Sequence, residues 1–140
     1  MVTQQFFVTL LIGVLLALPY VAHARRSKHP AVVFGIGLLV AALIYVIFAV
    51  AAANGRAALI EVGGVLFFGV LVALGLRWSA HWLAAGWLAH VAWDLLLHPV
   101  ESSSYAPWWY PVLCISFDLV VAGFVLATFW AHETAGKTRV

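Results

Sequence analysis

The chain has 140 residues, of which 66% are hydrophobic and only 9% are charged. Soluble domains average about 25% charged residues, so this composition excludes a soluble globular protein and indicates an integral membrane protein. Seven Lys and Arg residues give a net charge of +2, too little for a nucleic-acid-binding surface. The length allows a single domain, residues 1–140, and the single cysteine, Cys114, excludes an intrachain disulfide.

Hydropathy divides the sequence into five apolar segments, each close to the roughly 20 residues that cross a bilayer as a helix. Turn-forming or helix-breaking residues separate them, among them Pro30, Asn54, Gly55 and Pro99. The sequence therefore predicts an all-α polytopic membrane protein, a five-helix transmembrane bundle. Its predicted spans are Phe6–Ala24, Ala31–Ala53, Ala57–Leu76, Ser79–His98 and Trp108–Ala131.

The basic residues predict the orientation of these spans. If the N-terminus is outside and the C-terminus is cytoplasmic, Arg56 is the one basic residue outside. Such a bias follows the positive-inside rule and predicts a multi-pass protein of the cell membrane, in contact with membrane lipids. The basic residues on the cytoplasmic side are then Arg25, Arg26, Lys28, Arg77, Lys137 and Arg139.

The carboxylates Glu61, Asp94 and Asp118 fall inside the predicted spans, as does His90. An acid near the bilayer centre costs roughly 2.5–3.5 kcal/mol, so such residues must be paired, neutralised or exposed to a polar cavity. At about 1.5 Å per residue, Glu61 and Asp94 lie roughly 6 Å below the outer ends of their helices. His90, Asp118 and Tyr45 lie about 12 Å below theirs, so we expect one polar layer in the outer half of the membrane.

The stretch WLAHVAWDLLLHP places His90, Asp94 and His98 four residues apart, on one face of its helix, with Trp87 continuing that face. Because His98 precedes Pro99, we expect it to leave the regular helix and face the outer loop.

Histidine and carboxylate side chains are ligands for zinc, iron, copper and manganese. We therefore expect this layer either to bind a divalent transition metal ion or to do acid–base chemistry on a lipophilic small molecule, in which case it needs no cofactor. The spacing is less specific than the His-Glu-x-x-His motif. The candidate metal ligands are His90, Asp94, Asp118, Glu61 and His98.

Acid–base chemistry on a lipophilic small molecule needs the same catalytic residues, His90, Asp94, Asp118 and Glu61. Three aromatic side chains, Tyr45, Trp87 and Trp93, are candidates for binding that molecule, the two tryptophans by cation–π contact. The alternatives are a proton-coupled carrier of a small solute or ion, an accessory subunit of a larger membrane complex, a haem site, and simple pairing of the polar groups within the bundle. Five short helices enclose little volume, which also suggests a homo-oligomer.

The segments GWLAHVAWDLLLHP and YAPWWYPVLCISFDL, together with the helix that carries Glu61, resemble small bacterial integral membrane proteins classed only as a domain of unknown function. The resemblance covers about the last two thirds of the chain and implies a bacterial inner membrane, but no activity. More distantly, the sequence is similar to the five-span sterol-isomerase and sigma-2-receptor-like group, which places acids and a tryptophan in a lipid-facing pocket. The acids of this shorter chain do not align with that group, so no catalytic role follows.

Overall fold

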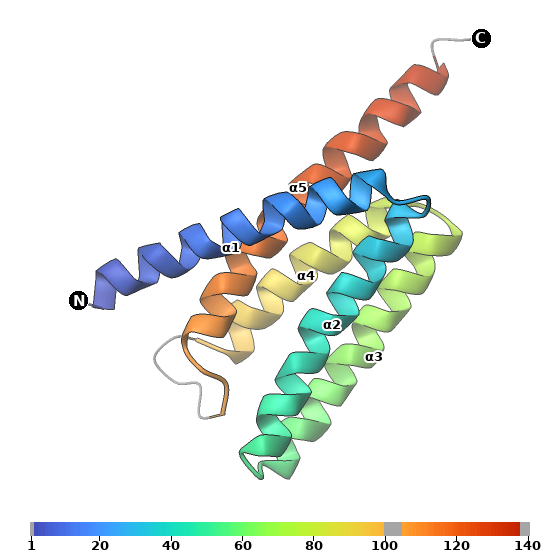
Figure 1. Ribbon diagram of the computed structural model, residues 1–140. Coiled ribbons are helices and arrows are strands. Elements are labelled where there is room, and N and C mark those ends of the chain that lie inside the picture. The colour runs from blue at the N-terminus through green and yellow to red at the C-terminus, as the bar shows by residue number, and fades with distance from the viewer. Residues whose placement is uncertain (1, 100–104, 138–140) are drawn as a thin grey trace.

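The computed structural model describes the backbone of residues 2–99 and 105–137 and the side chains of residues 3–99 and 105–128 (Figure 1). Its regular elements are five α-helices, as the hydropathy predicts. Arg139 lies outside the described residues. The helices are α1 (Val2–Arg26), α2 (Pro30–Ala51), α3 (Gly55–Arg77), α4 (His81–Leu97) and α5 (Trp109–Lys137).

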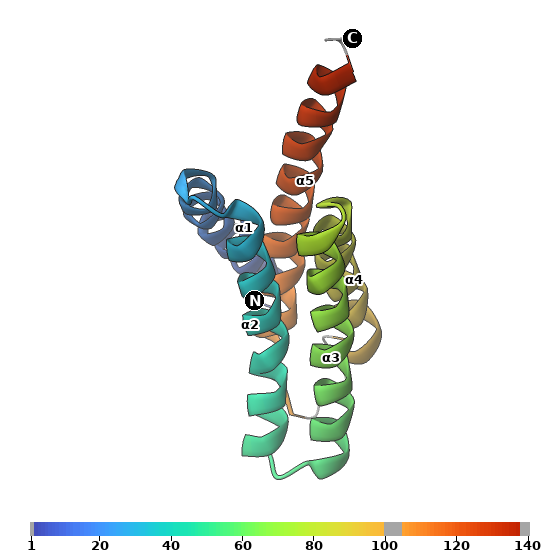
Figure 2. The same ribbon diagram turned by 90° about the vertical axis from the view of Figure 1, so that its right-hand side faces the viewer.

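Consecutive helices from α2 to α5 run in alternating directions, and α4 lies between α3 and α5 (Figures 1 and 2). The first helix departs from this pattern. It packs chiefly against α5, touches α2 much less, and crosses α5 at an angle in Figure 1. Gly13 permits the crossing, because a Cβ atom there would collide with the backbone of Leu113 and the hydroxyl of Ser116.

Four of the helices are long and apolar enough to cross a membrane: Thr3–Arg26, Pro30–Ala51, Gly55–Arg77 and Trp109–Thr128. Large apolar side chains cover their outer surfaces; Leu59, for example, is 76% exposed. Exposure of that kind over several helices is the pattern of a surface that faces lipid. The chain is therefore compatible with a multi-pass membrane protein.

The fourth helix is shorter, with 17 residues, or about 25 Å of rise. The predicted span Ser79–His98 loses residues at both ends. Ser79 accepts a hydrogen bond from the backbone N–H of His81 at the start. At the other end His98 has left the helix, with φ −124° and ψ 49°, because Pro99 disfavours helical backbone in the residue before it.

An apolar core fills the half of the bundle in which α2 and α4 begin and α3 ends. Trp87 on α4 is fully buried there, and Gly86 beside it lets α4 approach Leu38 of α2. The polar residues of the predicted layer lie along the same helices, toward the other end of the bundle. Other buried members of this core are Phe34, Phe68, Leu71, Leu83, Val121 and Val125.

Two adjacent glycines on α3 test how closely α3 and α4 must pack. A Cβ atom on Gly64 would lie 2.7 Å from Cζ2 of Trp93, whereas one on Gly63 would meet open space. We expect Gly64→Ala to lower the free energy of unfolding by about 1–3 kcal/mol through overpacking. Gly63→Ala should raise it by about 0.5–1 kcal/mol, because alanine favours helix. Thermal unfolding in detergent measures both; equal melting temperatures for the two variants would contradict the packing described.

Candidate metal centre and its polar surroundings

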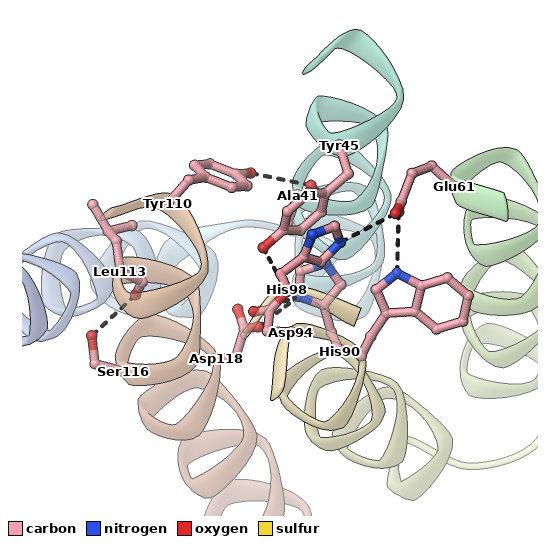
Figure 3. Close-up of polar contacts among 11 residues, drawn as sticks. Ala41, Tyr45, Glu61, His90, Asp94, His98, Tyr110, Leu113, Ser116 and Asp118 are labelled. Carbon is pink, nitrogen blue, oxygen red and sulfur yellow. Dashed lines mark hydrogen bonds and ion pairs between the residues drawn. The ribbon is translucent and has the colours of Figure 1, made fainter. Parts of the chain in front are cut away.

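Polar side chains from four helices converge inside the bundle (Figure 3). Tyr45 comes from α2, Glu61 from α3, His90 and Asp94 from α4, and Asp118 from α5. All five are buried, with exposed fractions of at most 2%. The residues that the sequence predicts at similar depth on separate helices therefore lie together.

His90, Asp94 and Asp118 form the inner group, which we call the His–Asp–Asp group. Nδ1 of His90 lies 2.7 Å from Oδ2 of Asp118 and 3.7 Å from Oδ2 of Asp94. One ligand atom from each residue lies within 4.8 Å of the others, close enough for one metal ion to bind all three. Among the described residues, no other group of three histidine, cysteine, aspartate or glutamate side chains brings its ligand atoms this close together.

Each member of the His–Asp–Asp group also has a buried polar atom without a hydrogen-bond partner among the described residues. These atoms are Nε2 of His90, Oδ2 of Asp94 and Oδ1 of Asp118. A buried polar atom left unsatisfied costs about 1–3 kcal/mol, and native proteins keep few of them. The protein thus leaves oxygen and nitrogen atoms available to a ligand at this point.

The charges of the group point the same way. With both carboxylates ionised and the imidazole neutral, the group would carry a charge of −2, which is costly in an apolar interior unless it is neutralised. A divalent cation matches that charge and binds the available atom types, since imidazole and carboxylate suit first-row transition metals. The residues present therefore fit a metal ion in both charge and donor chemistry.

Glu61 is held separately, by donors on α4 and in the α4–α5 connection. It accepts hydrogen bonds from the Tyr105 hydroxyl at 2.5 Å and from Nε1 of Trp93 at 3.1 Å. Nε2 of His98 lies 3.1 Å from Oε1 of Glu61. Burial and the bond to Glu61 raise the pKa of the Tyr105 phenol, so this group stays protonated and donates. Glu61 and His98 thus form a second cluster, outside the three-ligand group.

Tyr45 links the two clusters. Its hydroxyl donates to Oδ1 of Asp94 at 2.7 Å, and its ring stacks on His98 with centroids 4.0 Å apart and planes 10° from parallel. His98 faces the outer loop only in part: its ring contacts Tyr105 with centroids 5.4 Å apart, but only 1% of His98 is exposed, so it lies within the cluster and not at its edge. Leaving the helix at Pro99 turns the ring inward, where Tyr45 and Glu61 hold it.

The two predicted ligand-binding tryptophans have different surroundings. Trp93 is tied to Glu61 through its N–H. Trp87 is fully buried against Tyr20 and Phe117, with ring centroids 6.2 and 5.9 Å away, so it lies in the core below His90. Its Nε1 has no hydrogen-bond partner among the described residues.

Two tyrosines that the sequence analysis does not single out also belong to these surroundings. Tyr105 donates to Glu61, and Tyr110 donates to the backbone carbonyl of Ala41 at 3.1 Å and packs against Tyr45. Helical spacing could have predicted Tyr110 near the site, because it lies eight residues before Asp118 on the same helical face. Tyr105 lies in a connection without periodicity, so no spacing marks it.

Comparisons with protein-family models, with curated proteins and with solved structures find no match for this chain. The resemblance to small bacterial membrane proteins therefore stays a prediction, and the function has to be argued from the geometry.

The hydrogen bond from Tyr45 to Asp94 can be tested by removing one oxygen atom. We expect Tyr45→Phe to lower the free energy of unfolding by about 1–3 kcal/mol, because a buried carboxylate oxygen loses its donor. Tyr110→Phe is the matched control: its hydroxyl donates to a helix carbonyl, so its loss should cost less. Unfolding monitored by circular dichroism in detergent compares the two, and an equal or smaller effect for Tyr45→Phe would contradict the assignment.

Proposed function

We propose that this protein is a five-span membrane protein that binds a divalent transition metal ion, zinc, iron, copper or manganese, at the His–Asp–Asp group. One observation carries the proposal: three fully buried ligands from two helices place donor atoms within 4.8 Å of one another. The unpartnered atoms and the charge of the group support it. Three protein ligands leave a coordination position open, which is typical of catalytic metal sites.

The directions of the helices support the proposal that α4 also crosses the membrane. α3 and α5 meet the length and hydropathy of membrane spans and run in the same direction on either side of α4 (Figure 1). The chain must therefore return between them, and α4 is the segment that does so. On the positive-inside rule we propose that the N-terminus lies outside and the metal site in the outer half of the membrane, and on the resemblance that this is a bacterial inner membrane.

A second candidate function is acid–base catalysis on a lipophilic small molecule without a metal. The observation that favours it is the 2.7 Å contact between Nδ1 of His90 and Asp118, which orients the imidazole and leaves Nε2 available for proton transfer. Asp94, held by Tyr45, is the further carboxylate beside this pair.

A proton-coupled carrier is less well supported, because carriers need polar access from both membrane faces. Below the His–Asp–Asp group the bundle is closed by apolar side chains, Leu38, Trp87 and Val121 among them.

Metal content tests the first proposal. Purified protein supplied with zinc, manganese, iron and copper salts in separate preparations should retain about one ion per chain with at least one of them, measured by inductively coupled plasma mass spectrometry. His90→Ala and Asp94→Asn should remove most of it, because the first deletes one of three ligands and the second replaces a charged carboxylate ligand with a neutral amide. His23→Ala replaces an exposed histidine on α1 and should retain the metal.

Loading should also raise the melting temperature, because an ion that binds only the folded state stabilises it. Protein that retains none of the four ions would contradict the metal proposal and leave acid–base catalysis as the better candidate. Equal metal content in His90→Ala and wild type would show that any bound ion lies elsewhere.

Single cysteines test the orientation. In a Cys114→Ser background, Thr3→Cys places an exposed thiol near the N-terminus and Ser27→Cys places one between α1 and α2. A membrane-impermeant maleimide should label Thr3→Cys in intact spheroplasts and Ser27→Cys only after lysis. The reverse pattern would place the N-terminus inside.

A further inference from the structure

A lateral cavity of about 290 Å³ lies between α1, α2 and α5. Small residues of α2, Gly37 and Ala41, form one wall, and apolar side chains form most of the rest. Asp118, a member of the His–Asp–Asp group, also lines it. The cavity is thus an apolar recess on the side of the bundle that ends at the candidate metal centre. Its other lining residues are Leu16, Tyr20, Val40, Ile44, Tyr110, Leu113, Cys114 and Phe117.

The course of α1 explains why the space is there. α1 and α2 diverge from the short connection that joins them (Figure 1). Near that connection the hydroxyl of Tyr20 donates to the carbonyl of Val33, which holds the two helices together. Farther along, α1 lies on α5 at Gly13 while α2 continues beside α3. The recess is the wedge between them, and its open side faces the lipid.

The polar groups around the wedge are not equally available. The tyrosine hydroxyls are committed, Tyr20 to Val33 and Tyr110 to Ala41, at 2.7 and 3.1 Å. Cys114 is a buried free thiol, a weak donor and acceptor. Oδ1 of Asp118, in contrast, is buried and has no hydrogen-bond partner among the described residues. Asp118 is therefore the residue in the wall of this apolar recess that carries a strong acceptor without a partner.

We infer that this cavity binds a lipophilic alcohol from the membrane, with its chain in the wedge between α1 and α2 and its hydroxyl at Asp118. A chain in the wedge replaces lipid contacts with protein contacts, and the hydroxyl satisfies Oδ1. Asp118 is fully covered, so the wall side chains shift slightly when the hydroxyl enters. The cavity volume is near the lower end for small-molecule sites, which suits one chain of modest length.

A hydroxyl fits this position better than the other common head groups. A carboxylate would face the acidic His–Asp–Asp group, and an ammonium would compete with a metal ion for the same charge. A hydroxyl donates to a carboxylate and can also bind a metal ion through its oxygen. The inference rests on the proposed function where it makes the alcohol a ligand of the metal centre. Binding of the alcohol in the wedge does not itself require the metal.

Photolabelling of the full chain in lipid nanodiscs tests the inference. The probes are a diazirine-bearing dodecanol and the matching alkane without the hydroxyl, with labelled peptides mapped by mass spectrometry. We expect the alcohol to label the cavity walls on α1, α2 and α5 about tenfold more than the alkane, the ratio that one hydrogen bond to a charged acceptor supplies. Asp118→Leu should bring that ratio close to one.

Ala41→Phe fills the wedge and replaces no member of the His–Asp–Asp group, and it should abolish labelling of the walls by both probes. Ala92→Phe is the matched control, the same substitution in a separate apolar groove lined by α3 and α4, and it should leave the labelling unchanged. Equal labelling by alcohol and alkane, or wall labelling that survives Ala41→Phe, would overturn the inference.

Metal analysis of the same preparations separates this result from the proposed function. Ala41→Phe should retain the metal content of the wild type while losing the label. Wild-type protein that binds no metal but prefers the alcohol at the wedge walls would refute the metal proposal alone. Protein that binds metal but shows no preference for the alcohol would refute the inference about the cavity alone.

Discussion

The structure depends on one constraint: carboxylates inside an apolar bundle must be given partners. Glu61 has three donors around it, whereas Asp94 and Asp118 share His90 and one tyrosine hydroxyl. Packing follows from this requirement, because the partners come from different helices and hold them in register. It also separates the two clusters chemically. Glu61 has its donors, while all three members of the His–Asp–Asp group retain a buried polar atom without a partner among the described residues.

Much of this arrangement follows from the sequence through topology. Alternating helices place residues at equal distances from one membrane face at the same level, so counting along each span is enough to predict that Glu61, Asp94 and Asp118 lie near one another. Helical periodicity adds that His90 and Asp94 share a face. The five helices of the fold follow from hydropathy in the same way, because each apolar segment has the length of a span.

Other contacts of the site could not be predicted, because they depend on how each helix is rotated about its axis and on the path of the α4–α5 connection. Helix positions fix depth but not which carboxylate the imidazole meets, and His90 lies closer to Asp118 than to its neighbour Asp94, four residues away on α4. The proline after His98 shows that the helix ends there, yet the direction of the ring depends on Tyr45 of another helix. Tyr105 contacts Glu61 from the irregular connection between α4 and α5, where no helical periodicity indicates which way a side chain points.

The position of Tyr45 has a thermodynamic consequence. One side chain donates to Asp94 and stacks on the imidazole that contacts Glu61. An ion that draws Asp94 away from Tyr45 therefore also alters the surroundings of His98 and Glu61. Linkage requires the effect to be reciprocal: the free energy by which metal binding changes proton affinity at Glu61 equals that by which a proton at Glu61 changes metal affinity. A single phenol thus contacts both buried carboxylate clusters, and any coupling between them would pass through it.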